Sequence, residues 1–337
     1  MERLPTIDDV ARLAGVGKGT ASRVINGGSQ VSPKTQAKVL AAIEQLNFRP
    51  SSMARKLSKG RASRQIGVLE SFITAPAFVD RLRGIQEVIE AHDDLDLLLF
   101  SCRSPDRYGP KLSQIVEQRS VEALLIADLA VSDEQREVLG AAQIAAVSLS
   151  GVRGGLAYVG CDDEFGGYLA TRHLLELGHR RIGYVGDAFP DPFGFTTSRD
   201  RFAGYTRALQ EAGLPVDPGC VALGRHKKEE AVSLAMGLLS RPDRPTAIFA
   251  MADMQALGCL TAAHALGLAV PQDLSIIGFD DIEVSAHIGL STVSQHLVES
   301  GRIAARYILS VLTTGEGAVL EELPPVEVIA RRTTAHI

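Results

Sequence analysis

The chain has 337 residues, of which 45% are hydrophobic and 22% are charged. These values exclude wholesale disorder, and the length allows two or three domains. No apolar run approaches the roughly 18 residues of a membrane-spanning helix, and the N-terminus lacks the apolar core of a signal peptide. Cys102, Cys161, Cys220 and Cys259 lie far apart, without metal or redox spacing. We therefore expect a cytoplasmic protein without metal or cofactor.

The charge is divided unevenly along the chain. Residues 1–64 contain 12 Lys and Arg against 4 Asp and Glu, a net charge of +8. Residues 65–337 contain 23 against 36, a net charge of −13, so the whole chain carries only −5. A basic head before an acidic body is typical of a nucleic-acid-binding module joined to a second domain.

Three helices are predicted in the basic head. Gly15 ends the first, and a second extends from Lys18 to Asn26. The pair Ser32-Pro33, a capping serine before a proline, opens a third helix that ends near Leu46. Two short helices joined by a glycine-bearing turn and braced by a third indicate a helix-turn-helix domain over residues 1–48. The alternative is a small helical bundle with a solvated basic face.

The head resembles that of LacI/GalR transcriptional regulators. The matching runs are Thr6–Val16, Thr20–Asn26, Val31–Thr35 and Leu46–Pro50. In that family the first two exposed positions of the second helix and its arginine contact base edges, which implies Lys18, Gly19 and Arg23 here. The full set of expected DNA-contacting residues in the head is Thr6, Lys18, Gly19, Thr20, Ser22, Arg23, Asn26, Ser32 and Thr35.

Residues 49–62 form a short basic stretch after the head. A helix of this length is only marginally stable alone, so a plain linker is one interpretation. The family resemblance implies instead a hinge helix that folds when two copies meet over the minor groove. Leu57 would then be an apolar wedge between base steps, Ala54 would allow close approach, and Arg55 would contact a phosphate.

From Gln65 onward, short apolar runs alternate with amphipathic stretches, which predicts parallel α/β folding. The predicted strands are residues 66–69, 95–100, 123–126, 144–149, 182–185, 247–250 and 275–279. The predicted helices are residues 78–91, 111–118, 166–177, 201–212, 229–239 and 254–266.

A repeat within residues 63–337 predicts two similar lobes, each a doubly wound parallel sheet. Ile66-Gly67 and Ile182-Gly183 each open a strand, and the next helix carries Gly84 in one case and Gly204 in the other. Ligands of such sheets bind at the carboxyl ends of strands, so a cleft is expected between the lobes. The expected lobe ranges are 63–160 with 291–322, and 161–290 with 323–337.

The body also resembles LacI/GalR regulators over nearly its whole length and, through them, periplasmic sugar-binding proteins. The clearest segments are Gly166–Gly183, Arg201–Tyr205 and Ser275–Asp281. The resemblance implies that Arg201 and Asp280 hold sugar hydroxyls. Without it, Arg201 could form a surface salt bridge and Asp280 could cap a helix. The full set of expected effector-binding residues is Phe78, Arg201, His226, Asp253, Asp280 and Gln295.

Together these features predict a transcriptional regulator, a repressor that binds double-stranded operator DNA as a homodimer under the control of a sugar effector. Ala252 stands where the family usually places a ligand-binding asparagine, so a common hexose cannot be assumed. The alternative is control by a protein partner or a phosphorylated metabolite. We expect no enzymatic activity, since the chain has no nucleophile elbow and no dinucleotide fingerprint.

Overall fold

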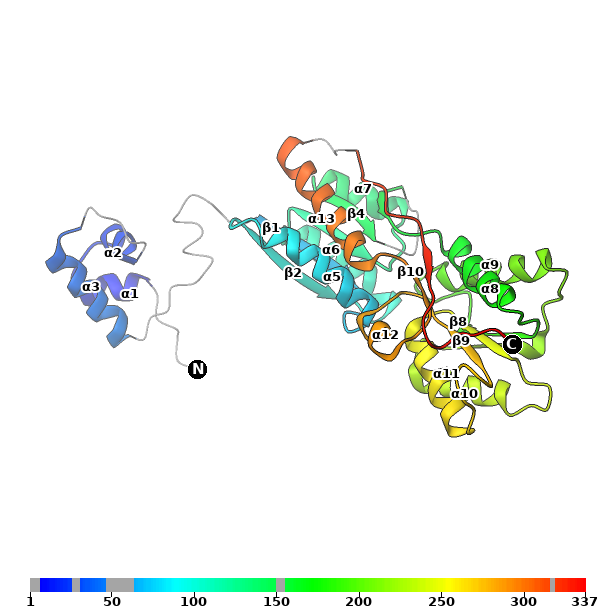
Figure 1. Ribbon diagram of the computed structural model, residues 1–337. Helices are drawn as coiled ribbons and strands as arrows, with labels where there is room; N and C mark the ends of the chain where they lie inside the picture. Colours follow the sequence, from blue (N-terminus) through cyan, green and yellow to red (C-terminus); the bar gives the residue numbers. More distant parts are fainter. Residues whose placement is uncertain (1–6, 26–30, 47–63, 150–154, 316–318) are drawn as a thin grey trace. The chain divides into compact units, whose positions relative to one another are not determined.

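A computed structural model describes residues 7–25, 31–46, 64–149, 155–315 and 319–337. The chain divides into a small unit, residues 1–64 with 94–96, and a large unit, residues 65–93 with 97–337 (Figure 1). The small unit is helical and the large unit has parallel sheets with helices, as predicted. None of the described helices combines the length with the apolar character that a transmembrane span requires.

The small unit consists of α1 (Ile7–Ala14), α2 (Lys18–Ile25) and α3 (Pro33–Gln45). The three helices begin and end close to the predicted positions. Gly15 has a φ of +65°, the left-handed conformation that ends α1 at little cost for a residue without Cβ. Apolar residues at helical spacing on each helix close the core, namely Val10, Ala11, Ala14, Ala21, Val24, Val39 and Ala42.

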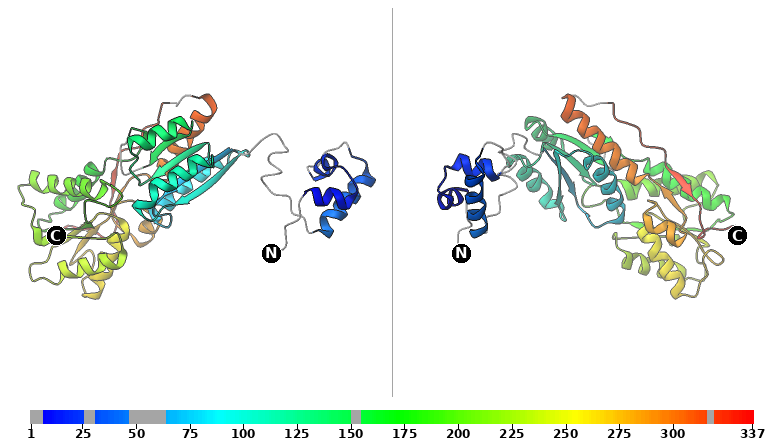
Figure 2. Two further views of the ribbon diagram at one scale, coloured as in Figure 1. Left: turned by 180° about the vertical axis from the view of Figure 1, so that it is seen from behind. Right: turned by 60° about the vertical axis from the view of Figure 1, so that its left-hand side comes forward.

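The first sheet of the large unit has the strand order β2-β1-β3-β4-β5, and the pairs β1–β3, β3–β4 and β4–β5 are parallel. Its strands are β1 (Arg64–Glu70), β2 (Leu95–Ser101), β3 (Ala123–Ala127), β4 (Ala145–Leu149) and β5 (Ala157–Val159). Leu124 and Ile126 pack with α6 (Pro105–Glu117) and α7 (Asp133–Ala141). The opposite face is covered by α5 (Pro76–Ile89) and α13 (Leu297–Thr314), which lie side by side (Figures 1 and 2).

The second sheet has the order β7-β6-β8-β9, again with parallel pairs. Its strands are β6 (Ile182–Asp187), β7 (Val221–Gly224), β8 (Ala247–Ala250) and β9 (Ser275–Ile277). Val185 and Ile248 pack with α10 and α11, while their neighbours Tyr184 and Phe249 pack with α8 and α9, because successive side chains point to opposite faces. These helices are α8 (Asp163–Glu176), α9 (Thr197–Glu211), α10 (Lys228–Leu239) and α11 (Asp253–Ala265).

The chain passes from the first sheet to the second between β5 and α8, and it returns before α13. The short helix α12 (Glu283–Ile288) follows β9, and an antiparallel pair, β10 (Thr292–Ser294) with β11 (Glu327–Ile329), accompanies the remaining connections. The two sheets fall within the predicted lobe ranges, whose boundaries stay a prediction. The seven predicted strands are all present.

Among the described α-helices and strands, seven were not predicted: α7, α12, α13, β5, β7, β10 and β11. The strands among them have three or four residues, too few to show a period. For α13 a signal was available, because Leu297, Gly301, Ala304 and Ile308 recur at helical spacing and are all buried.

The repeated glycines Gly84 and Gly204 have the same structural reason in both lobes. A Cβ at Gly84 would lie 1.9 Å from the carbonyl oxygen of Val298, on α13. A Cβ at Gly204 would lie 2.0 Å from the carbonyl oxygen of Glu164, on α8. The helix pairs α5–α13 and α8–α9 therefore pack at a distance that only glycine allows.

Candidate functional site

The second helix of the head presents the expected DNA-contacting side chains. Those in the described part of α2, which are exposed or partly exposed, are Lys18, Gly19, Thr20, Ser22 and Arg23. The ammonium of Lys18 donates to Asp8 Oδ2 at 2.9 Å, so a carboxylate of α1 already partners this cation. Ser32 caps α3, since its Oγ accepts from Thr35 N at 3.3 Å, as the sequence predicted.

Five further expected DNA contacts lie outside the described residues. They are Thr6 and Asn26 of the head, and Ala54, Arg55 and Leu57 of the hinge. Their roles, and the hinge helix itself, stay predictions.

The large unit encloses a cavity of about 350 Å³. Its lining residues follow the carboxyl ends of β1, β3, β6, β8 and β9, so both sheets contribute to it. This is the location expected for a ligand site in open α/β sheets. Five of the six expected effector-binding residues line the cavity, namely Phe78, Arg201, His226, Asp280 and Gln295.

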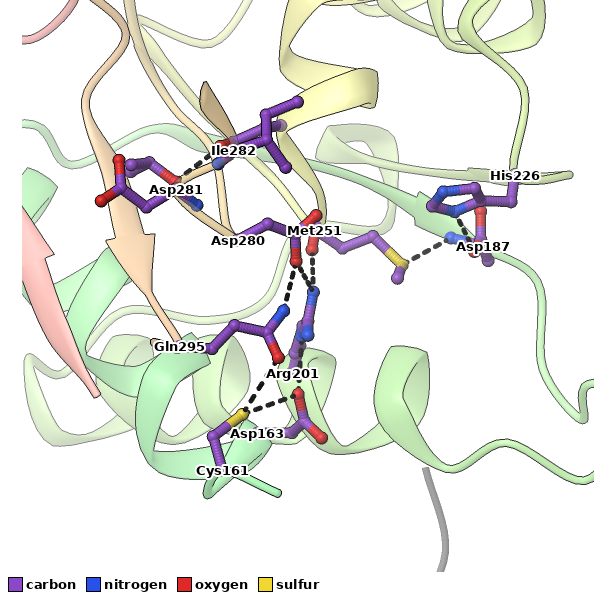
Figure 3. Close-up of polar contacts among 12 residues, drawn as sticks. Cys161, Asp163, Asp187, Arg201, His226, Met251, Asp280, Asp281, Ile282 and Gln295 are labelled. Atoms are coloured by element: carbon purple, nitrogen blue, oxygen red, sulfur yellow. Dashed lines mark hydrogen bonds and ion pairs between the residues drawn. The ribbon is translucent and has the colours of Figure 1, made fainter. Parts of the chain in front are cut away.

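Arg201, on α9, lies at the centre of a buried polar cluster (Figure 3). Its Nε donates to Asp163 Oδ1 at 2.8 Å, and its Nη1 donates to Met251 O at 2.6 Å and to Asp280 Oδ1 at 3.4 Å. The guanidinium also stacks 3.5 Å from the centroid of the Phe279 ring. Burial opposes its charge, but the two carboxylates outweigh this and raise the pKa of Arg201. The surface salt bridge is therefore excluded.

Asp280 points into the same cluster from the loop after β9. Its backbone has a φ of +123°, a strained conformation that aims the carboxylate at Arg201 and Gln295. Burial raises the pKa of Asp280, and Arg201 opposes that rise. The residue does not cap a helix, because the N-cap of α12 is Ile282.

Gln295 connects the two lobes of the large unit at the cavity. Its Nε2 donates to Asp280 Oδ1 at 2.6 Å, and its Oε1 accepts from Arg81 Nη2 at 2.7 Å. Arg81 belongs to α5 of the first lobe and lies 3.8 Å from Asp128, which follows β3. A continuous polar chain therefore extends from α5 through Gln295 to Arg201.

Asp253 is not among the residues that line the cavity, and its contact with the effector stays a prediction. Its carboxylate is fully buried and accepts hydrogen bonds from Ile282 N, Ser285 Oγ and Thr292 Oγ1 at 3.1, 2.7 and 2.6 Å. These bonds fix the loop that carries Asp280. Burial, with the nearby charge of Asp280, raises the pKa of Asp253 to about 7.

A second polar group surrounds His226 at the far end of the cavity. His226 Nδ1 lies 2.8 Å from Asp187 Oδ2 (Figure 3), and Gln255 Nε2 donates to Asp187 Oδ1 at 2.7 Å. Desolvation opposes protonation of the imidazole, but the hydrogen bond and charge of Asp187 prevail and raise the pKa of His226. His226 therefore keeps its proton to a higher pH than a free histidine does.

Aromatic rings lie at another part of the cavity wall. Phe72, after β1, and Phe195, after β6, both line it, with ring centroids 6.4 Å apart. Phe193 contacts both rings, edge-on at 5.6 Å to Phe72 and stacked at 5.6 Å on Phe195. Ala252 lines the cavity with a methyl group where an amide was expected from the family. The wall therefore combines apolar rings with buried charges.

Several lining residues were not predicted from the sequence. Asp128 and Asp187 come two positions after the predicted strands 123–126 and 182–185, so the rule for carboxyl ends of parallel strands could have found them. Arg81 and Gln255 lie within helical stretches and match no motif, so only the packing of α5 and α11 reveals them.

Comparison with known proteins identifies the family. Residues 6–51 match the family described as bacterial regulatory proteins, lacI family, and residues 171–334 match the periplasmic binding protein-like domain. The HTH-type transcriptional repressor PurR of Haemophilus influenzae (strain PittEE) is 32% identical over 342 residues, which cover 99% of this chain and 100% of the relative. The chain belongs to the LacI family. It is thus a ligand-regulated, DNA-binding transcriptional regulator, and the relatives found are regulators rather than enzymes.

Solved structures of LacI-family members agree with this. The lac repressor dimer bound to operator and the anti-inducer ONPF is 28% identical with a TM-score of 0.73, covering 99% of this chain and 100% of that one. The regulator CelR in complex with cellobiose is 28% identical with a TM-score of 0.68, covering 98% and 99%. A LacI-family regulator from Enterococcus faecium with bound ribose is 29% identical with a TM-score of 0.71, covering 81% and 100%.

Proposed function

We propose that this LacI-family regulator is a repressor that binds operator DNA as a homodimer and releases or holds it according to a sugar bound in the cavity. The observation that carries the proposal is the buried pair of Arg201 and Asp280 at the cavity wall. A guanidinium and a carboxylate side by side offer donors and acceptors to neighbouring hydroxyl groups. The solved relatives with cellobiose and ribose support a sugar here.

The homodimer is supported by a groove outside the cavity, in which exposed valines lie beside charged residues. Val79 of α5 and Val284 of α12 are 42% and 39% exposed and line one groove. A second copy of this chain would remove both side chains from water. Two copies are also what DNA reading requires, since one short helix contacts few bases. The relative solved on operator is a dimer.

Control of DNA binding would act through the cavity. A ligand that contacts both lobes favours the state in which they are closest, and so shifts the population of the paired lobes. The hinge at residues 49–62 would then gain or lose its order on the minor groove.

The test begins with selection of a preferred duplex from a random pool by the full-length protein. We expect Arg23→Ala to weaken binding of that duplex roughly 10- to 100-fold, since a base contact is worth about 1–3 kcal/mol. Arg107→Ala, an exposed arginine on α6, should leave it unchanged. Binding should weaken steeply as salt rises, because several phosphates are neutralised.

The effector is then sought by titrating sugars against the protein–DNA complex and following fluorescence anisotropy. Asp280→Asn should abolish the response while operator binding persists. A protein that binds the duplex but ignores every small molecule would contradict the sugar and favour control by a protein partner. A protein without a preferred duplex would contradict the whole proposal.

A further inference from the structure

Two lysines lie in the cavity wall beside His226. Lys227 and Lys228 line the cavity where α10 begins, Lys228 being its first residue. Together with His226 they place three consecutive basic residues at one end of the ligand space.

The carboxylates that line the cavity already have partners within the protein. Each lining carboxylate has a cation or an N–H donor against it; these carboxylates are Asp128, Asp163, Asp187, Asp191 and Asp280. In the described part of the chain, by contrast, no ion pair or side-chain hydrogen bond is made by Nζ of Lys227 or Lys228. The ammonium groups of both lysines are therefore available to a ligand at this end of the cavity.

The acidic residues of α10 do not cancel this charge at close range. The Glu230 carboxylate is held by Arg225, whose N and Nε donate to it at 2.9 and 2.8 Å. These hydrogen bonds lower the pKa of Glu230. The charge of Lys227 makes only the smallest contribution to this lowering. The free N–H groups at the start of this 12-residue helix add to the positive potential.

A buried acceptor in the same region also lacks a partner. Gln255 lines the cavity and is only 1% exposed, and its Nε2 is held by Asp187. Its Oε1 has no hydrogen-bond partner among the described residues. A buried carbonyl without a partner is unfavourable, so this oxygen indicates a donor on the ligand.

We propose that the effector carries an oxyanion, a phosphate ester or a carboxylate, which binds Lys227 and Lys228, and a hydroxyl group that donates to Gln255. His226 lies beside the same group and, when protonated, adds to its binding. This inference rests on the proposed function and narrows its sugar to a phosphorylated sugar or a sugar acid.

The test compares matched ligands on the full-length protein by isothermal titration calorimetry. The probes are D-glucose, D-gluconate, D-glucose 6-phosphate and inorganic phosphate, which separate the carbon chain from the two kinds of oxyanion. We expect at least one anionic probe to bind at least tenfold more tightly than glucose, and a preference between gluconate and the phosphates identifies the oxyanion.

The double variant Lys227→Ala/Lys228→Ala should weaken the anionic probes at least tenfold and leave glucose within twofold. It should fold normally, since alanine favours helix and neither side chain caps α10 in the described structure. The control is Arg107→Ala/Lys111→Ala, which removes the same two positive charges from α6. It should leave the binding of glucose and of every anionic probe unchanged. Equal binding of glucose and all anions, no binding of any anion, or equal loss in both double variants would overturn the inference. Operator binding, measured on the same samples, would then still stand as the test of the proposed function.

Discussion

Gln295 lies in the connection between the two lobes. Its amide nitrogen donates to Asp280 Oδ1 at a distance of 2.6 Å. The other end of the same amide accepts from Arg81 at 2.7 Å. One neutral side chain thus satisfies a buried carboxylate of the second lobe and a buried guanidinium of the first. Any ligand that displaces the amide from Asp280 must also disturb Arg81 and α5.

Gln295→Leu should lower the free energy of unfolding by about 3 kcal/mol, because it leaves two buried charged groups each short of a partner. Urea unfolding measures this. Gln114→Leu is the control, since Gln114 is exposed on α6 and should change stability by less than about 0.5 kcal/mol. Equal stability of the two variants would contradict the bridging role.

Gly167→Ala should destabilise the protein by about 3 kcal/mol and weaken effector binding. Its Cβ would lie 2.2 Å from the carbonyl oxygen of Arg201, so α8 and α9 would have to separate and move the guanidinium. Gly140→Ala on α7 is the matched control, because its Cβ meets no described atom within 4 Å. That variant should gain up to about 1 kcal/mol from helix propensity. A stable Gly167→Ala would show that the helix pair tolerates a side chain.

The raised pKa of Asp253 leads us to expect that the folded protein loses stability as pH rises. Burial raises the pKa of Asp253 to about 7 in the folded protein, whereas an aspartate of the unfolded chain ionises near its ordinary pKa of 3.8. The folded state therefore binds the proton more tightly, and the stability from this group is lost as pH rises from about 4 to 7, by about 1 kcal/mol between pH 6 and 7. Urea unfolding across this range measures it.

Asp253→Asn is the corresponding variant. The amide nitrogen of the asparagine can donate to Thr292 Oγ1, and its single oxygen can still accept, so the side chain mimics the protonated acid. The stability of the variant relative to the natural protein should rise by about 1 kcal/mol from pH 6 to pH 7. His226, whose pKa is also raised, titrates in both proteins and cancels in the difference. Parallel pH profiles would contradict the shifted pKa.

Val284→Glu should convert the dimer to a monomer if the groove at Val79 and Val284 is the contact between two copies. A carboxylate there would be brought out of water at an apolar interface. Sedimentation velocity at micromolar concentration measures the change. Val138→Glu on α7 starts from the same exposure, 39%, and should stay dimeric. A dimeric Val284→Glu would place the interface elsewhere.

Much of this protein could be predicted from local sequence. The head is specified by neighbours in the chain: Ser32 caps α3, Gly15 ends α1, and apolar residues at helical spacing close the core. The seven main strands are short apolar runs, which any buried parallel sheet requires. Arg201 and Asp280 were found because they belong to motifs of the family, and the structure brings them together.

Only the tertiary structure decided which side chains share the cavity. Asp253 and Gln255 are two positions apart at the start of α11. The carboxylate of Asp253 accepts hydrogen bonds from the segment after Asp280, whereas Gln255 lines the cavity. Arg81 meets Gln295 across 214 positions of sequence. Periodicity reports which face of an element is apolar, but partners so distant in sequence depend on how the lobes pack, which no local pattern encodes.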